Sequence, residues 1–105
     1  MRLTQREQSD VAAVAKAVLP AGSRVSLFGS RLDDSRRGGD VDLWIELAGN
    51  PTAAEMVRFR GRLTAGLYQR WGERRIDMVM SLLGQPDARP VVQAARRNSI
   101  ELACA

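Results

Sequence analysis

The first twenty residues follow a helical pattern of apolar and polar positions. Thr4 and Glu7 have the spacing of a capping box, the reciprocal pair of hydrogen bonds that begins many helices. Pro20 and Gly22 then interrupt the pattern. The sequence therefore predicts an amphipathic helix that ends near Pro20, with one apolar face made by Val11, Val14, Ala15 and Val18.

Two apolar runs with the two-residue period of a strand come next, and a polar loop separates them. Residues 24–28 form the first predicted strand, in which Val25 and Leu27 lie opposite Ser26 and Phe28. The loop from 30 to 39 ends in two glycines, and the second predicted strand covers 41–47. A Gly-Asn-Pro sequence ends that strand.

A second helix and a third strand are predicted in the following segment. Thr52 and Glu55 repeat the capping-box spacing. Gly61 and Gly66 each weaken a helix by about 1 kcal/mol relative to alanine, so we expect close packing to explain them. The helix has an apolar stripe of Met56, Phe59, Leu63, Leu67 and Trp71, and it ends at Gly72.

The remaining chain predicts a strand at 75–80, a loop at 84–89 and a helix from Pro90 to about Asn98. Residues 100–103 fit either a short edge strand or a helical tail. The element order indicates an α+β fold in a single domain, residues 1–105. We expect a small mixed β-sheet of three to four strands packed against helices.

The composition is that of an ordinary globular protein, 45% hydrophobic and 27% charged. The net charge of +4 comes from fifteen arginines and one lysine, but these are dispersed, so nucleic acid is not favoured as a partner. We expect no membrane association and a cytoplasmic location, since there is no signal peptide or membrane span, and Cys104 is the single cysteine. The absence of histidine means that a metal site would use carboxylates, which favour magnesium, manganese or calcium.

Three aspartates are candidate metal ligands. Asp40 and Asp42 lie two residues apart, about 6.6 Å along a strand, so their side chains share a face. Asp77 interrupts an apolar strand, and it comes beside this face if the second and third strands are neighbours. Alternatively, the pair is the solvated face of an edge strand, and Asp77 pairs with an arginine such as Arg74 or Arg75.

Gly29 and Ser30 form a small turn just before these carboxylates in the sequence. Exposed amide groups and a serine hydroxyl can hold phosphate oxygens, while metals on the carboxylates hold others. Neither a P-loop nor a dinucleotide-binding fingerprint is present. The carboxylates and the small turn together therefore indicate a metal and phosphate site more strongly than either feature does alone.

At these residues the sequence resembles the nucleotidyltransferase superfamily of DNA polymerase beta, specifically its minimal stand-alone bacterial members. The shared pattern is an apolar residue, Gly29, Ser30, a loop, an Asp-x-Asp pair at Asp40 and Asp42, and a later carboxylate, Asp77. Two features depart from many minimal members: the loop has nine residues, and Gly39 replaces a serine. The roles of Arg36 and Arg37 are therefore undecided.

The resemblance implies a polymerase beta palm-like fold and a two-metal mechanism. Asp40, Asp42 and Asp77 would hold two Mg²⁺ ions, and Asp77 would also receive the proton of the attacking hydroxyl. Gly29 and Ser30 would bind the outer phosphates of ATP or another nucleoside triphosphate. Arg31 matches the common Gly-Ser-Arg form, and it either meets the triphosphate or is a surface arginine.

The resemblance also suggests an acceptor. Minimal members often act as antitoxins that transfer AMP to a helical nuclease toxin, so we expect AMPylation of a protein hydroxyl in a toxin and antitoxin pair. The alternative is a non-catalytic protein of the same fold that neutralises its partner by docking. A nucleotidyltransferase acting on nucleic acid ranks third, and the sequence leaves a homo-oligomer open.

Overall fold

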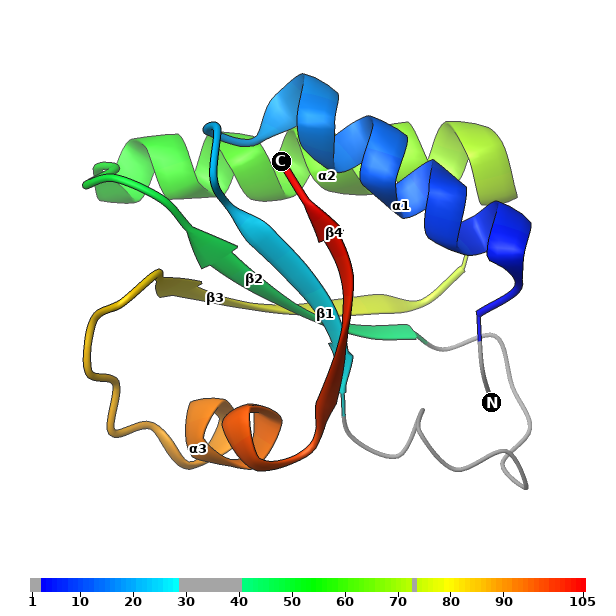
Figure 1. Ribbon diagram of the computed structural model, residues 1–105. Coiled ribbons are helices and arrows are strands. Elements are labelled where there is room, and N and C mark those ends of the chain that lie inside the picture. The colour runs from blue at the N-terminus through cyan, green and yellow to red at the C-terminus, as the bar shows by residue number, and fades with distance from the viewer. Residues whose placement is uncertain (1–2, 29–40, 73) are drawn as a thin grey trace.

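The computed structural model describes residues 3–28, 41–72 and 74–105. Seven elements follow one another in the predicted order (Figure 1): α1 (Gln5–Val18), β1 (Arg24–Phe28), β2 (Val41–Leu47), α2 (Ala53–Trp71), β3 (Ile76–Leu82), α3 (Pro90–Arg97) and β4 (Ser99–Cys104). β3 runs two residues beyond its predicted end. The C-terminal segment is a strand and not a helical tail.

The four strands form one mixed sheet in the order β3-β2-β1-β4. β1 pairs antiparallel with both β2 and β4, whereas β2 and β3 are parallel. Parallel neighbours need a crossover connection, and α2 supplies it. The predicted α+β class and mixed sheet are therefore confirmed, with β3 and β4 as the two edge strands.

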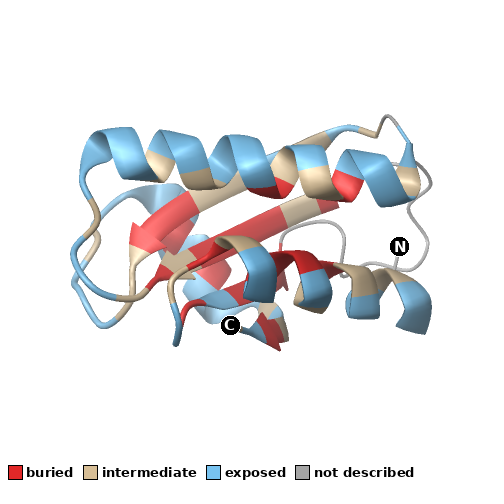
Figure 2. Ribbon diagram, turned by 90° about the horizontal axis from the view of Figure 1, so that it is seen from above, coloured by how far each residue is buried: buried red, intermediate tan, exposed pale blue. Residues whose placement is uncertain are grey.

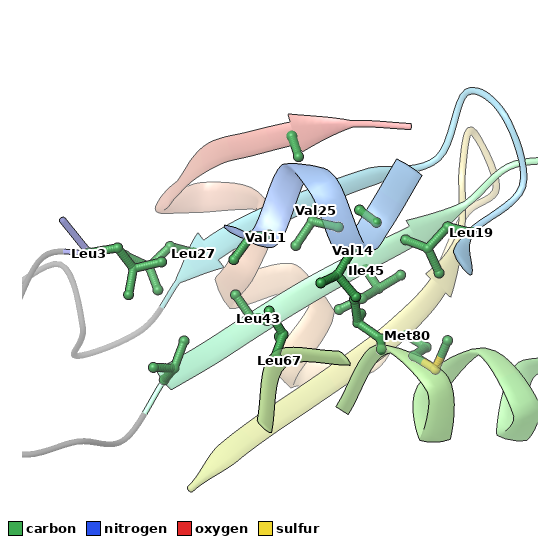
Figure 3. Packing of buried hydrophobic residues seen from close by; sticks show 14 of the residues in the cluster. Leu3, Val11, Val14, Leu19, Val25, Leu27, Leu43, Ile45, Leu67 and Met80 are labelled. Carbon is green, nitrogen blue, oxygen red and sulfur yellow. The ribbon is translucent and has the colours of Figure 1, made fainter. Parts of the chain in front are cut away.

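The main core lies between the sheet and the pair α1 and α2, which cover the same face (Figures 1 and 2). Exposed residues line the outer surfaces of these two helices, and buried residues line the strands beneath them. Figure 3 shows this packing, in which Val14 and Leu67 meet Val25, Leu43 and Ile45 of the sheet. The helical faces predicted from the apolar periodicity are the buried ones.

The opposite face of the sheet is covered in part by α3. Val92 and Ala95 of this helix are fully buried against Phe28 and Trp44. All four residues from Val25 to Phe28 are consequently buried, because β1 lies between two packed layers. α3 packs against only the middle of this face. The two ends of the face are therefore left for functional groups.

Both predicted capping boxes are present. The Thr4 hydroxyl accepts from the Glu7 backbone N–H at 3.0 Å, and the Glu7 carboxylate accepts from the Thr4 N–H at 2.8 Å. Thr52 and Glu55 make the same two bonds at 3.1 and 2.8 Å. These bonds satisfy backbone donors that have no partner inside a helix and so fix where α1 and α2 begin.

The two helical glycines have different surroundings. A Cβ atom at Gly66 would lie 2.6 Å from Cγ1 of Val14, so the absence of a side chain allows α1 and α2 to approach. At Gly61 nothing lies within 4 Å of the same added atom. Close packing therefore accounts for Gly66 as expected, whereas that expectation is wrong for Gly61.

Charged groups join the beginning of α1 to the end of α2. Asp10 accepts hydrogen bonds from Arg70 at 3.1 Å and from the indole of Trp71 at 3.0 Å. Glu7 accepts from the guanidinium of Arg74, which lies over the Trp71 ring. The two helices are thus fixed to each other by polar contacts as well as by the core.

The Glu7 contact is expected to make stability depend on pH. Burial raises the pKa of Glu7, but the hydrogen bonds from Thr4 and Arg74 outweigh it and leave the pKa below 4.5. The stabilisation is therefore present above pH 4.5 and is lost as the pH falls through the lowered value. We expect Glu7→Gln to cost about 1 to 2 kcal/mol at neutral pH, the usual contribution of a charged hydrogen bond. Urea unfolding of both proteins over a pH series checks this, and a difference that does not shrink in acid would contradict it.

Candidate metal and nucleotide site

Two of the predicted carboxylates come together where β2 and β3 begin. Asp42 and Asp77 are each the second residue of their strand, and they are direct partners in the parallel register. Their neighbours Val41 and Leu43 are buried in the core beneath the helices. Because side chains alternate along a strand, Asp42 and Asp77 lie on the other face of the sheet. The predicted adjacency of the second and third strands is confirmed.

The proximity of these carboxylates has an electrostatic cost. Neighbouring strands lie about 4.8 Å apart, so two negative charges at partner positions repel by roughly 3 kcal/mol at an effective dielectric constant near 20. Asp42 is partly buried and Asp77 is exposed. A cation at this end of the sheet reduces the repulsion, so the pair favours binding of one.

Arg75 provides one such cation. Its Nε atom lies 3.5 Å from Oδ2 of Asp77, and both side chains are more than half exposed. The alternative pairing of Asp77 with a neighbouring arginine is therefore present in the structure. An exposed pair of this kind contributes about 0 to 1 kcal/mol, which leaves Asp77 able to exchange Arg75 for a metal ion.

The other predicted site residues lie outside the described part of the chain: Gly29, Ser30, Arg31 and Asp40. The described residues that flank this segment are Phe28 and Val41. Leu27 pairs with Leu43, so β1 ends beside the beginning of β2. Phe28 and Val41 therefore both lie at the end of the sheet that carries Asp42 and Asp77 (Figure 1).

The donor set of the described residues suits a hard cation in part. Asp42 and Asp77 supply carboxylate oxygens from two rigid strands, and such ligands suit Mg²⁺, which commonly takes only one or two carboxylates from the protein. Across residues 3–28, 41–72 and 74–105, no cluster has three or more acidic, histidine or cysteine side chains that could hold a metal. Completion of the predicted triad depends on Asp40.

Many arginines are engaged within the fold. Two of them donate to backbone carbonyls of the edge strand β3, where they occupy acceptors that another strand would otherwise use. The bonds run from Arg60 to Met78 and from Arg89 to Met80, each at 2.6 Å, while Arg70 and Arg74 pair with Asp10 and Glu7. These four arginines are therefore held by partners within the described part of the chain.

The sequence analysis missed a second group of polar residues on the same sheet face. Ser26, Glu46 and Arg96 line an open basin at the other end of this face. A signal was available, because Asp42 and Glu46 are four residues apart on one strand and so share a face. The apolar character of the surrounding residues concealed it.

Comparisons with known proteins do not identify a family. No protein-family model matches the chain, and a search of curated proteins finds no significant match. Among the described helices, none has the length and apolar character that a membrane span requires. The similarity to nucleotidyltransferases thus depends on the sequence motif, and the function that follows from it is a proposal.

Proposed function

We propose that this protein is a Mg²⁺-dependent nucleotidyltransferase of the polymerase beta type. The observation that carries the proposal is the side-by-side register of Asp42 and Asp77 at one end of a rigid sheet. Two adjacent carboxylates repel each other, and a divalent ion held between them would offset that repulsion. Gly29 and Ser30 follow Phe28, the last residue of β1, in the sequence and would supply the phosphate-binding groups.

The residues have separate roles in the proposed reaction. Asp40, Asp42 and Asp77 hold the metal, which would supply charge stabilisation at the α-phosphorus. Gly29 and Ser30, with Arg31, hold the outer phosphates. The acceptor hydroxyl oxygen forms a bond to the α-phosphorus of a nucleoside triphosphate, the bond to pyrophosphate breaks, and Asp77 receives the hydroxyl proton.

ATP is the proposed nucleotide donor, and a hydroxyl of a partner protein is the proposed acceptor. The described helices and strands all belong to one fold built on a single sheet, and none forms a separate unit that would bind an acceptor. A macromolecule that brings its own surface can present a hydroxyl there. We therefore propose AMP transfer to a helical nuclease toxin, with this protein as antitoxin.

The direct test is transfer of label from a nucleoside triphosphate. The protein is incubated with Mg²⁺, with each α-labelled triphosphate in turn, and with the product of the neighbouring gene. We expect label from ATP to appear covalently on the partner and to disappear when EDTA is added. Absence of transfer from all four nucleotides, with a partner that binds, would contradict the enzymatic proposal.

A second candidate function is docking without turnover. The Asp77–Arg75 ion pair favours it, because this pair lowers the repulsion between the carboxylates without any metal. Under this alternative the partner is neutralised by binding alone and Mg²⁺ has no effect. Neutralisation of the partner in the presence of EDTA would support docking over transfer.

A further inference from the structure

The basin lies on the same sheet face as the proposed metal site, at the other end of that face, and it is large enough for a small ligand. Its accessible volume is about 880 Å³, within the range of small-molecule sites. Ser26, Trp44 and Glu46 on the sheet form its floor, and residues 84–86 and Arg96 form its sides. These sides come from the β3–α3 connection and the last turn of α3, which lie below the sheet in Figure 1.

α3 separates this basin from the carboxylate pair. Glu46 lies four residues beyond Asp42 on β2, about 13 Å along the strand. Between them, Trp44 is only 6% exposed, because Val92 and Ala95 pack against it. The basin is therefore a second site and not an extension of the proposed nucleotide site.

The basin is lined by a buried serine, Ser26. Among the described residues, three serines are buried. Ser23 accepts from the Ala48 backbone N–H at 3.0 Å, and Ser81 accepts from the Trp44 indole at 2.9 Å. Ser26 is 4% exposed and makes no hydrogen bond to any described residue. Buried polar groups nearly always have a partner, so the Ser26 hydroxyl indicates that something outside the chain bonds to it.

Glu46 is a second acceptor on the floor. It is partly buried and forms no hydrogen bond or ion pair within 4 Å in the described part of the chain. Burial raises the pKa of Glu46, Arg24 and Arg96 lower it, and Glu101 raises it further. A ligand that donates N–H groups from a positive charge would satisfy Glu46 and Ser26 together.

Arg96 supplies the complementary donor. One of its N–H groups bonds to the Gln85 carbonyl at 2.8 Å, which holds the guanidinium at the side of the basin. The other N–H groups form no hydrogen bond or ion pair with described residues. Arg24 is paired with Glu101 at 3.6 Å, so the basin as a whole is balanced in charge. Balanced charge disfavours a polyanion such as a nucleotide.

We propose that the basin binds a small zwitterion of the amino-acid class. Its ammonium group lies on Glu46 and Ser26, and its carboxylate lies on Arg96. The ligand thereby satisfies the buried hydroxyl and carboxylate that the fold leaves without donors. This site is independent of the proposed transferase activity.

The test is a screen of single L-amino acids, each at millimolar concentration, by thermal shift followed by calorimetry. We expect at least one to raise Tm and to bind with one site per chain. Its N-acetyl derivative lacks the ammonium group and its decarboxylated amine lacks the carboxylate, so both should bind at least about tenfold more weakly. Failure of every amino acid to bind would overturn the proposal and leave water as the occupant.

Variants separate binding from folding. Glu46→Gln and Arg96→Gln should weaken binding about tenfold or more, and Arg97→Gln, on the adjacent residue of α3, should leave it unchanged. Ser26→Ala should weaken binding about two- to tenfold while the Tm of the ligand-free protein stays equal or rises, because an unpartnered buried hydroxyl is removed. Undiminished binding in both the Glu46 and Arg96 variants would overturn the proposal.

Discussion

Replacing Asp42 or Asp77 by asparagine is expected to reduce Mg²⁺-dependent label transfer by at least about 100-fold. Replacing a residue that only orients a metal ligand already lowers metal affinity or activity by about 10- to 100-fold, and replacing a direct ligand lowers it further. Both variants should fold, because each removes one of two adjacent negative charges. In metal-free buffer the Tm of Asp77→Asn is therefore expected to stay close to that of the unchanged protein, since its ion pair with Arg75 is exposed.

Asp87→Asn is the matched control for these two variants. Asp87 is a carboxylate that accepts hydrogen bonds from Arg89, and it lies in the connection after the end of β3, whereas Asp77 lies at the beginning of that strand. We expect its transfer rate to be unchanged. Mg²⁺ should raise the Tm of the unchanged protein and of Asp87→Asn, but not that of Asp42→Asn. If Asp42→Asn keeps the full transfer rate, the metal site is elsewhere; if it loses transfer yet still neutralises the partner, docking is the function.

Gly66→Ala is expected to destabilise the protein, although alanine is the better helix former. The added Cβ would lie 2.6 Å from Cγ1 of Val14, and Val14 cannot move aside easily. It is 5% exposed, and valine has a single preferred rotamer in a helix. Relief requires α1 and α2 to separate, at a cost of about 1 to 3 kcal/mol for overpacking. This cost exceeds the gain in helix propensity of about 1 kcal/mol.

Gly61→Ala is the matched control on the same helix. Nothing lies within 4 Å of its added Cβ, so only the propensity gain remains. We expect Gly61→Ala to raise the free energy of unfolding by about 1 kcal/mol. Both variants gain the same helix propensity, so urea denaturation should separate them by the overpacking cost, about 1 to 3 kcal/mol. Equal effects at the two positions would show that the helices do not approach as the structure has them.

The helices were the most predictable part of the fold. Thr4 with Glu7 and Thr52 with Glu55 determine helix starts through bonds between residues three apart, so local sequence suffices. The end of β3 was less predictable, because Ser81 is a polar residue that is nevertheless buried in the strand. Its hydroxyl accepts a hydrogen bond from Trp44, a residue 37 positions away, which no local pattern indicates. The C-terminal strand was ambiguous for the same reason, because its pairing with β1 is a long-range contact.

The sequence predicted which residues would form the candidate metal site, but it did not determine how they lie relative to one another. Asp42 and Asp77 are far apart in sequence, and their register depends on the crossover through α2. The basin was missed because Ser26 and Glu46 interrupt apolar strands singly. Only the position of α3 turns them into the floor of one cavity.

The sequence by itself determined the three helices, the first three strands, their order and the capping bonds, because each depends on residues within a few positions of one another. Tertiary structure alone decided the strand order, the parallel register that places Asp42 beside Asp77, and the contact that requires glycine at position 66. The physical reason is that these features come from contacts between distant segments, whose geometry is set by packing the whole core. The surroundings of Ser26 belong to the same class, since the residues that line the basin with it come from segments far apart in the sequence.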